Sequence, residues 1–202
     1  MKYILVAPGS YDPMSYGHLR MFHKAKQIQG VVGCVASITD NDFEYDKERL
    51  AKDATKDLTW LEVFSWPTVL QYEPKTEDLL DYYEQTFNTM GFRPTLDGHF
   101  YFNCEDLTDV KVKLLCGSDH FRSIINEEGR DEAERLLQRG VVMMTRFDVD
   151  TESLLKDYFL EKYRNNVVTI KDPVFGCVEQ RLVRNEEENM CLLPLLPKQY
   201  SY

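Results

Sequence analysis

Residues 7–18 read APGSYDPMSYGH, and this stretch joins a short apolar run to a segment with helical spacing. Gly9 lets the backbone turn close to a ligand, because glycine carries no side chain. Ser10 and Tyr11 can present main-chain N–H groups in such a turn. The stretch is therefore expected to bring the backbone close to an anion, at the junction of a strand and a helix.

The end of the same stretch can start a helix. Either Ser15 or Gly17 can begin it, so that the unpaired N–H groups and the positive end of the helix dipole point at an anion. His18 would then lie in the first turn, where an imidazole N–H can reach a phosphate oxygen. The alternative is a turn with a capping histidine and no ligand, but the whole string favours a phosphate site.

Short apolar runs alternate with longer amphipathic ones along the chain, which predicts strands and helices in alternation. The expected strands are residues 2–7, 31–37, 60–64, 112–116, 141–145 and 166–170. The expected helices are residues 18–29, 47–58, 76–90, 131–138 and 151–163. With right-handed crossovers, this order predicts an α/β fold with a doubly wound, mostly parallel sheet. Residues 1–202 are expected to form a single domain, with 91–109 as a connecting loop or an insertion.

The charge balance restricts the partners. The net charge is −10, from 34 acidic and 24 basic residues. A nucleic-acid or anionic-membrane surface needs clustered Lys and Arg, so we expect neither partner. No stretch of the sequence is long and apolar enough to span a bilayer. A small anionic ligand stays compatible with this charge, because a few local donors can outweigh distant carboxylates.

The cysteines and the first residues indicate the compartment. Five cysteines are present, and they show no close pair with metal-ligand spacing. No metal site built by the protein is therefore expected, and free thiols in a reducing compartment are the favoured interpretation. The apolar run at residues 3–7 is too short for a secretory signal. We expect an intracellular protein, cytoplasmic or nuclear.

Two motifs carry a resemblance to a known family. Residues 9–22, GSYDPMSYGHLRMF, resemble the signature of nucleotidyltransferases of the HxGH class. They are most similar to the eukaryotic nicotinamide mononucleotide adenylyltransferases, in which Gly-Ser-Phe-Asn-Pro runs on to a His-Leu-Arg helix. Residues 114–119, LLCGSD, resemble that family's Leu-Leu-Cys-Gly-Ala-Asp. Weaker likenesses at residues 54–66, 145–146 and 192–194 extend the resemblance over most of the chain.

The resemblance implies a Rossmann-like enzyme of NAD biosynthesis. Its partners would be ATP, used with Mg²⁺, and nicotinamide or nicotinate mononucleotide. The phosphate of the mononucleotide would attack the α-phosphorus of ATP, giving NAD and pyrophosphate without a covalent enzyme intermediate. Catalysis would consist mostly of positioning and of stabilising charge on the phosphoryl oxygens. A homo-oligomer is compatible with the sequence.

The same resemblance assigns roles to residues of the first motif. His18 would donate to the α-phosphate, and Ser15 stands where the class has its first His or a Thr. Gly9, Ser10 and Tyr11 would line the mononucleotide side of the site.

Four further residues receive roles outside that motif. Gly117 and Asp119 would meet the ribose of the adenosine. Lys47 would reach a substrate phosphate, and Thr76 occupies the place of a contact with the nicotinamide amide. Read alone, Lys47 is more often a surface lysine and Asp119 could be a helix cap.

The sequence departs from the family in two regions. Residues 174–181 read VFGCVEQR, where the family has an Ile-Ser-Ser-Thr-(x)-(x)-Arg turn that holds the ATP phosphates. Arg181 would supply the phosphate contact, although it is one residue out of register, and Arg184 lies a turn further on. The aromatic residues that stack on the nicotinamide are also missing from their expected places, one of which is taken by residues 126–129.

These departures leave two alternatives to adenylyl transfer onto a nicotinamide or nicotinate mononucleotide. One is a non-catalytic nucleotide-binding relative, which the missing Ser-Ser-Thr turn would favour. The other is a nucleotidyltransferase of the same class with a different phosphate-bearing acceptor, which the substituted stacking residues would allow. The retained His18 and its glycine-containing loop favour the adenylyltransferase.

Overall fold

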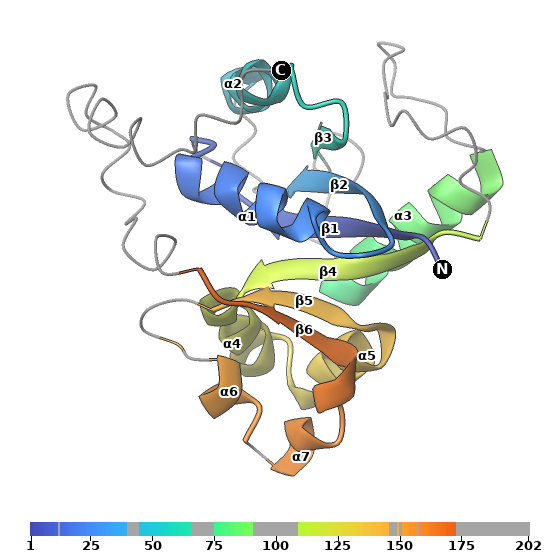
Figure 1. Ribbon diagram of the computed structural model, residues 1–202, viewed down its shortest axis with the longest axis vertical. Helices are drawn as coiled ribbons and strands as arrows, with labels where there is room; N and C mark the ends of the chain where they lie inside the picture. Colours follow the sequence, from blue (N-terminus) through green and yellow to red (C-terminus); the bar gives the residue numbers. More distant parts are fainter. Residues whose placement is uncertain are drawn as a thin grey trace.

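A computed structural model of the chain describes residues 1–11, 13–39, 45–65, 75–90, 109–145, 149, 151–156 and 158–172. Their centre is a six-stranded parallel sheet with strand order β3-β2-β1-β4-β5-β6 (Figure 1). The strands are β1 Tyr3–Gly9, β2 Val31–Ile38, β3 Leu61–Ser65, β4 Lys111–Gly117, β5 Val141–Met144 and β6 Val167–Ile170. Each predicted strand is present within two residues of its expected ends, and the doubly wound α/β fold is confirmed.

The helices follow the strands in the order that the sequence indicates, with two differences. They are α1 Tyr16–Lys26, α2 Tyr45–Thr55, α3 Thr76–Met90, α4 Ser118–Glu127, α5 Arg130–Arg139, α6 Thr151–Leu154 and α7 Tyr158–Glu161. Helix α4 was not predicted. The continuous helix expected over residues 151–163 was wrong, because Lys156 donates its N–H to the Ser153 carbonyl and a tight turn follows α6.

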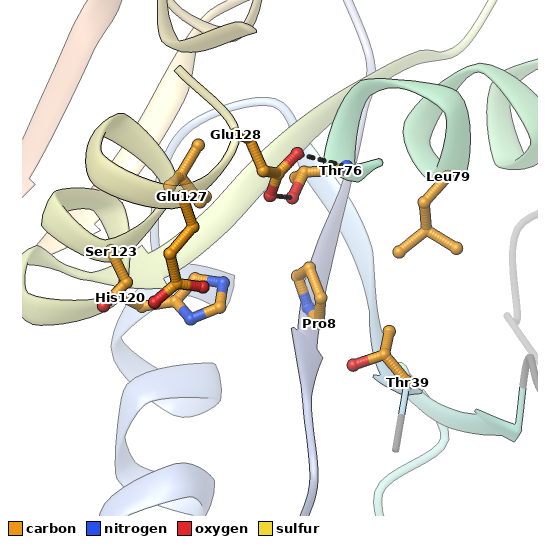
Figure 2. Close-up of a pocket in the computed structure, with 9 residues that line it drawn as sticks. Pro8, Thr39, Thr76, Leu79, His120, Ser123, Glu127 and Glu128 are labelled. Atoms are coloured by element: carbon orange, nitrogen blue, oxygen red, sulfur yellow. Dashed lines mark hydrogen bonds between the residues drawn. The ribbon is translucent and has the colours of Figure 1, made fainter. Parts of the chain in front are cut away.

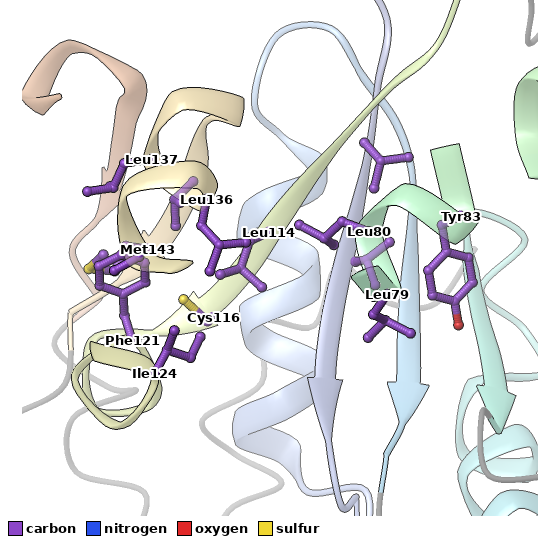
Figure 3. Packing of buried hydrophobic residues seen from close by; sticks show 14 of the residues in the cluster. Leu79, Leu80, Tyr83, Leu114, Cys116, Phe121, Ile124, Leu136, Leu137 and Met143 are labelled. Atoms are coloured by element: carbon purple, nitrogen blue, oxygen red, sulfur yellow. The ribbon is translucent and has the colours of Figure 1, made fainter. Parts of the chain in front are cut away.

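Successive residues of β1 face opposite sides of the sheet and so belong to two separate cores. Leu5 and Ala7 pack with the helices on one face, α1 and α2. Ile4 and Val6 pack with those on the other face, α3, α4 and α5, whose buried side chains Figure 3 shows in part. Both faces of the sheet are therefore covered by helices, as a parallel sheet requires.

All described strands belong to this one sheet. Most of the expected loop or insertion at 91–109 lies outside the described residues, and only its last residue, Asp109, is described. The extent of the predicted single domain, residues 1–202, stays a prediction because the described part ends at Asp172. Among the described residues, no helix is long and apolar enough to cross a membrane.

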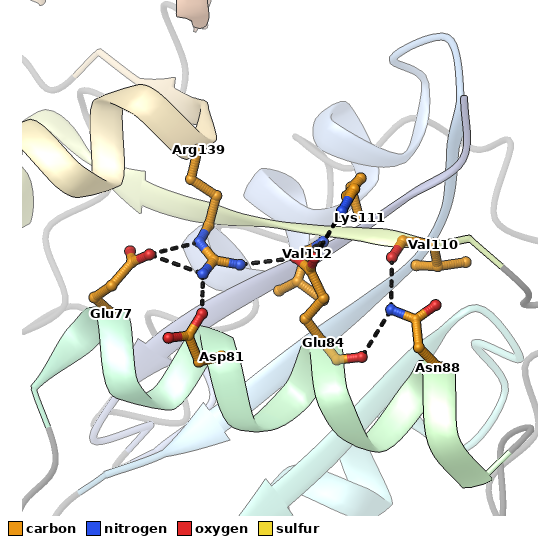
Figure 4. Close-up of polar contacts among 8 residues, drawn as sticks. All are labelled: Glu77, Asp81, Glu84, Asn88, Val110, Lys111, Val112 and Arg139. Carbon is orange, nitrogen blue, oxygen red and sulfur yellow. Dashed lines mark hydrogen bonds and ion pairs between the residues drawn. The ribbon is translucent and has the colours of Figure 1, made fainter.

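Helices α3 and α5 are joined by a cluster of ionic contacts around Arg139 (Figure 4). The Arg139 Nε donates to Glu77 at 2.9 Å, and its Nη1 donates to Glu84 at 2.8 Å. The Nη2 of the same guanidinium contacts Asp81. Glu84 also accepts from Lys111 Nζ at 3.1 Å. Arg139 is therefore the cation that three carboxylates of α3 share.

We expect Arg139→Met to lower the free energy of unfolding by about 2 kcal/mol. The loss is large because the Arg139 side chain is only 15% exposed and its removal leaves three carboxylates facing one another. The matched control is Lys111→Met, at a side chain that is 57% exposed, and we expect it to cost less than about 1 kcal/mol. Urea denaturation measures both variants. Equal losses would show that the Arg139 cluster contributes no more than a surface ion pair.

Candidate functional site

The sheet divides at the carboxyl ends of its two central strands. The pairing of β1 with β4 runs from Tyr3 and Lys111 to Val6 and Leu114. Beyond that point β1 continues beside β2 as far as Gly9, and β4 continues beside β5 as far as Gly117. The chain also reverses the direction of its crossovers between these strands. Such a switch point is where open α/β sheets bind their ligands.

A cavity of about 300 Å³ lies beside this division, on the face covered by α3 and α4 (Figure 2). Two of its lining residues, Pro8 and Thr39, come from the ends of β1 and β2. Thr76 and Leu79 come from the first turn of α3. The others, from α4 and the residue after it, are His120, Ser123, Ile124, Glu127 and Glu128. Of the predicted site residues that the structure describes, Thr76 is the one that lines this cavity.

Ser15 is the N-cap of α1 and exchanges hydrogen bonds with His18. The Ser15 Oγ accepts from the His18 main-chain N–H at 3.3 Å, and the Ser15 main-chain N–H donates to His18 Nδ1 at 3.0 Å. Because a main-chain amide can only donate, Nδ1 must carry a lone pair. The proton of the neutral imidazole is therefore on Nε2, the nitrogen on the far side of the ring.

This capping geometry bears on the two interpretations of His18. The capping histidine is present in the structure, as the alternative to a phosphate site supposed. Capping occupies Nδ1 and the main-chain N–H of His18, and it fixes Nε2–H as the donor that the ring would offer to an anion. The two roles are therefore compatible in one side chain.

Tyr11 packs its side chain against the His18 ring. It has a positive φ of 48°, which turns its side chain inward, and its hydroxyl donates to the Ala7 carbonyl at 2.6 Å. The two rings meet edge to face with centroids 5.0 Å apart. Burial, followed by the nearby Tyr83 and Cys34, raises the pKa of the Tyr11 hydroxyl well above its usual value. The Tyr11 side chain is thus part of the core, and only its main chain can face a ligand at this turn.

Gly9 and Ser10 complete the loop after β1. A Cβ on Gly9 would come within 3.3 Å of the Tyr11 ring. The position of this ring is therefore a sufficient reason for a glycine here, and no bound ligand is needed to account for it. Ser10 is exposed. Across the division of the sheet, Gly117 is the N-cap of α4, and Asp119 lies in the first turn of that helix. The loop after β1 and the start of α4 therefore flank the switch point together.

Lys47 and Thr76 lie in helices on opposite faces of the sheet. Lys47 is half-buried in the first turns of α2 and does not belong to the cavity lining. Thr76 donates its N–H to Glu128 Oε2 at 2.9 Å and its hydroxyl to Oε1 at 2.7 Å. Arg181, with the whole of the divergent stretch 174–181, lies outside the described residues, as do Arg146 and Trp66.

His120 and Glu128, both polar residues of the cavity lining, were not among the predicted site residues. The Nε2 of His120 is buried and has no hydrogen-bond partner within the described part of the chain. Burial lowers the pKa of this imidazole, against the opposite effect of Asp119, Glu128 and Glu127. The available signal was the acidic pair at positions 127 and 128, within the residues 126–129 that the resemblance puts in the place of a stacking aromatic residue. Without helix α4, no side-chain direction for this pair could be assigned from the sequence.

We expect Ser15→Ala to lower the free energy of unfolding by about 1 kcal/mol, because α1 loses its side-chain N-cap. The alanine also removes the hydroxyl that lies 3.0 Å from His18 Nδ1, so the ring loses one of the groups that orient it. Thermal unfolding with and without ATP measures both effects. Ser15→Thr is the control, since threonine keeps the capping oxygen. An unchanged stability of Ser15→Ala would contradict the cap.

The chain resembles known proteins in sequence and in fold. No family model matches the chain. It is 26% identical over 200 residues to nicotinamide/nicotinic acid mononucleotide adenylyltransferase 2 of Saccharomyces cerevisiae, covering 90% of this chain and 49% of that protein. It is 23% identical to the Bos taurus adenylyltransferase 1, covering 98% of this chain and 85% of that protein. The chain thus spans about half the length of the yeast relative.

The solved structures agree in fold. The nicotinic acid mononucleotide adenylyltransferase of Plasmodium falciparum complexed with NaAD superposes with a TM-score of 0.62 at 16% identity, covering 95% of this chain and 89% of the other. The same enzyme complexed with APC gives a TM-score of 0.61 at 15% identity, covering 89% and 80%. The fold is therefore the Rossmann-like fold of these nucleotidyltransferases.

Proposed function

Because the chain is a divergent relative of the nicotinamide/nicotinic acid mononucleotide adenylyltransferases, we propose that it transfers the adenylyl group of ATP to a nicotinamide or nicotinate mononucleotide. A phosphate oxygen of the mononucleotide attacks the α-phosphorus of ATP. The bond from that phosphorus to the bridging oxygen of the β-phosphate breaks, and pyrophosphate leaves. The dinucleotide is NAD or its nicotinate analogue.

One observation carries the proposal, namely the division of the sheet between β1 and β4 with the capped start of α1 beside it. In the proposed complex the α-phosphate lies at this helix start, where His18 Nε2–H donates to a non-bridging oxygen. The helix dipole adds positive potential at the same place. Both groups stabilise charge that increases in the transition state, so their contribution is larger there than in the ground state.

The other predicted residues complete the proposed complex. Gly117 and Asp119 contact the ribose of the adenosine, and Gly9 and Ser10 present main-chain groups on the mononucleotide side. Lys47 and Arg181 are proposed to reach the phosphates. Mg²⁺ is proposed to enter as its complex with ATP. Among the described residues, no group of three or more His, Cys, Asp or Glu residues could hold a metal ion. Such an ion commonly keeps several waters and binds through substrate phosphates.

The proposed setting follows from the thiols and the charge. Cys34 and Cys116 are buried free thiols, which suits a reducing compartment, so we place the protein inside the cell, in the cytoplasm or the nucleus. With a net charge of −10, its proposed partners are ATP and the mononucleotide, with no nucleic acid. A homo-oligomer stays compatible with these features.

Pyrophosphate release tests the proposal. The chain is mixed with ATP and Mg²⁺, with and without nicotinamide mononucleotide or nicotinate mononucleotide, and pyrophosphate is measured. Release that depends on either mononucleotide supports the proposal. Saturable ATP binding without release would instead favour a non-catalytic relative, and release only with another phosphate-bearing acceptor would favour a different nucleotidyltransferase.

A further inference from the structure

The cavity between α3 and α4 has an acidic lining. Two carboxylates, Glu127 and Glu128, belong to it, together with the side chain of His120. No Lys or Arg is present among the described residues that line it. Both carboxylates act electrostatically on the His120 imidazole, and Figure 2 shows Glu127, Glu128 and His120 at the α4 side of the cavity.

Glu128 is held in a fixed orientation. Both of its oxygens accept hydrogen bonds from Thr76, one from the main-chain N–H at 2.9 Å and one from the hydroxyl at 2.7 Å. These bonds join the end of α4 to the first turn of α3 across 52 residues of sequence. The carboxylate therefore cannot turn away from the cavity without losing two hydrogen bonds.

His120 does not offset this acidity. Burial lowers the pKa of its imidazole, so the ring is neutral at pH 7. Its Nε2 is buried without a hydrogen-bond partner among the described residues, and a polar ligand in the cavity would supply one. The described lining thus offers acceptors and a neutral imidazole, and no cation that could pair with a ligand carboxylate.

The two mononucleotides differ in charge at the base. In both, the ring is a pyridinium cation. The carboxamide of nicotinamide is neutral and carries two N–H donors, whereas the carboxylate of nicotinate is an anion with acceptors only. Acidic side chains attract the pyridinium of either base, but they repel the carboxylate and can accept from the carboxamide.

Given the proposed function, on which this inference rests, we infer that the pyridinium base of the mononucleotide enters this cavity and that Glu127 and Glu128 select nicotinamide over nicotinate. Glu128, which is fixed by Thr76, is the main residue of this selection. Glu127, which is exposed, adds to the negative potential at the same end of α4.

Steady-state kinetics with the two mononucleotides tests the inference. We expect kcat/KM for nicotinamide mononucleotide to exceed that for nicotinate mononucleotide by at least about tenfold, as one unfavourable charge contact implies. Glu128→Gln should narrow this ratio at least about threefold. Glu127→Gln, at a side chain with no hydrogen bond to Thr76, should narrow it in the same direction and to a smaller extent. Glu161→Gln on α7 removes the same charge outside the cavity lining and should leave the ratio unchanged.

The outcomes separate this inference from the proposed function. Turnover of both mononucleotides at similar kcat/KM, or a preference for nicotinate, overturns the selection and leaves the adenylyltransferase in place. Turnover of neither refutes the proposed function, and calorimetric binding of the two mononucleotides then decides the inference. The selection is supported if the unmodified chain binds nicotinamide mononucleotide more tightly than nicotinate mononucleotide and if the two affinities become more nearly equal in Glu128→Gln. Equal binding, or no binding of either, overturns it.

Discussion

The variant His18→Ala is expected to lose about 100-fold to 1,000-fold in kcat while keeping its fold. The physical reason is the position of the imidazole. Its Nδ1 is held by Ser15 at 3.0 Å, its ring rests against Tyr11, and the proton of the neutral ring is therefore on Nε2. In the proposed complex, removing this donor removes a hydrogen bond that stabilises charge at the α-phosphate. Steady-state pyrophosphate release at saturating substrates measures the loss.

The matched control is His23→Ala in the same helix. His23 is half-buried and meets Trp60 edge to face with ring centroids 4.9 Å apart, so the same truncation removes an imidazole without a proposed phosphate contact. We expect its turnover to stay within about threefold of the unmodified chain. Circular dichroism should show both variants folded. Activity of His18→Ala within a few-fold of the unmodified chain would contradict the assignment of the site.

The second large effect is expected at the ion pair between α1 and the residue that ends the described chain. Arg20 donates Nε and Nη2 to the two carboxylate oxygens of Asp172, at 2.7 and 3.1 Å. The Asp172 side chain is 1% exposed and that of Arg20 is 14% exposed. Arg20→Met should lower the free energy of unfolding by about 3 kcal/mol, because it leaves a buried carboxylate without its guanidinium.

Urea denaturation measures this loss, and Lys24→Met provides the control. Lys24 lies one helical turn further along α1 and is half-buried. Replacing it removes the same charge without a buried partner among the described residues, so we expect a change below about 0.5 kcal/mol. If Arg20→Met cost no more than Lys24→Met, the pair with Asp172 would not hold α1 to the end of β6.

The strands of this protein could be predicted from the sequence because each is a short, largely apolar run, whether it is buried on both faces like β5 or partly exposed like β6. Helix α4 could not, because few of its residues are apolar and its N-cap, Gly117, provides no side-chain hydrogen bond. Its packing depends on Phe121 and Ile124, which become buried only when α4 lies beside α3 and α5. Local pattern is thus sufficient for the sheet and insufficient for a helix whose stability comes from tertiary contacts.

Some parts of the candidate site could likewise be predicted from the sequence, and others could not. The glycine-containing loop and the start of α1 with His18 in its first turn could be predicted, since a glycine turn leading into a capped helix is a local feature. The phosphate contact of His18 stays a prediction. The inward turn of the Tyr11 ring could not, because it depends on a positive φ that sequence patterns assign mainly to glycine. The cavity depends on the meeting of Thr76 with Glu128, which are 52 residues apart, so no local pattern reveals it.

We propose above that this chain joins the α-phosphate of ATP to a mononucleotide at the start of α1. The most direct measurement follows a label on the α-phosphorus of ATP, with Mg²⁺ and nicotinamide mononucleotide, through separation of the products. We predict that the label appears in NAD at the rate at which pyrophosphate is released, and that His18→Ala slows both equally. Label that stays in ATP, or that appears only in AMP, would contradict the claim.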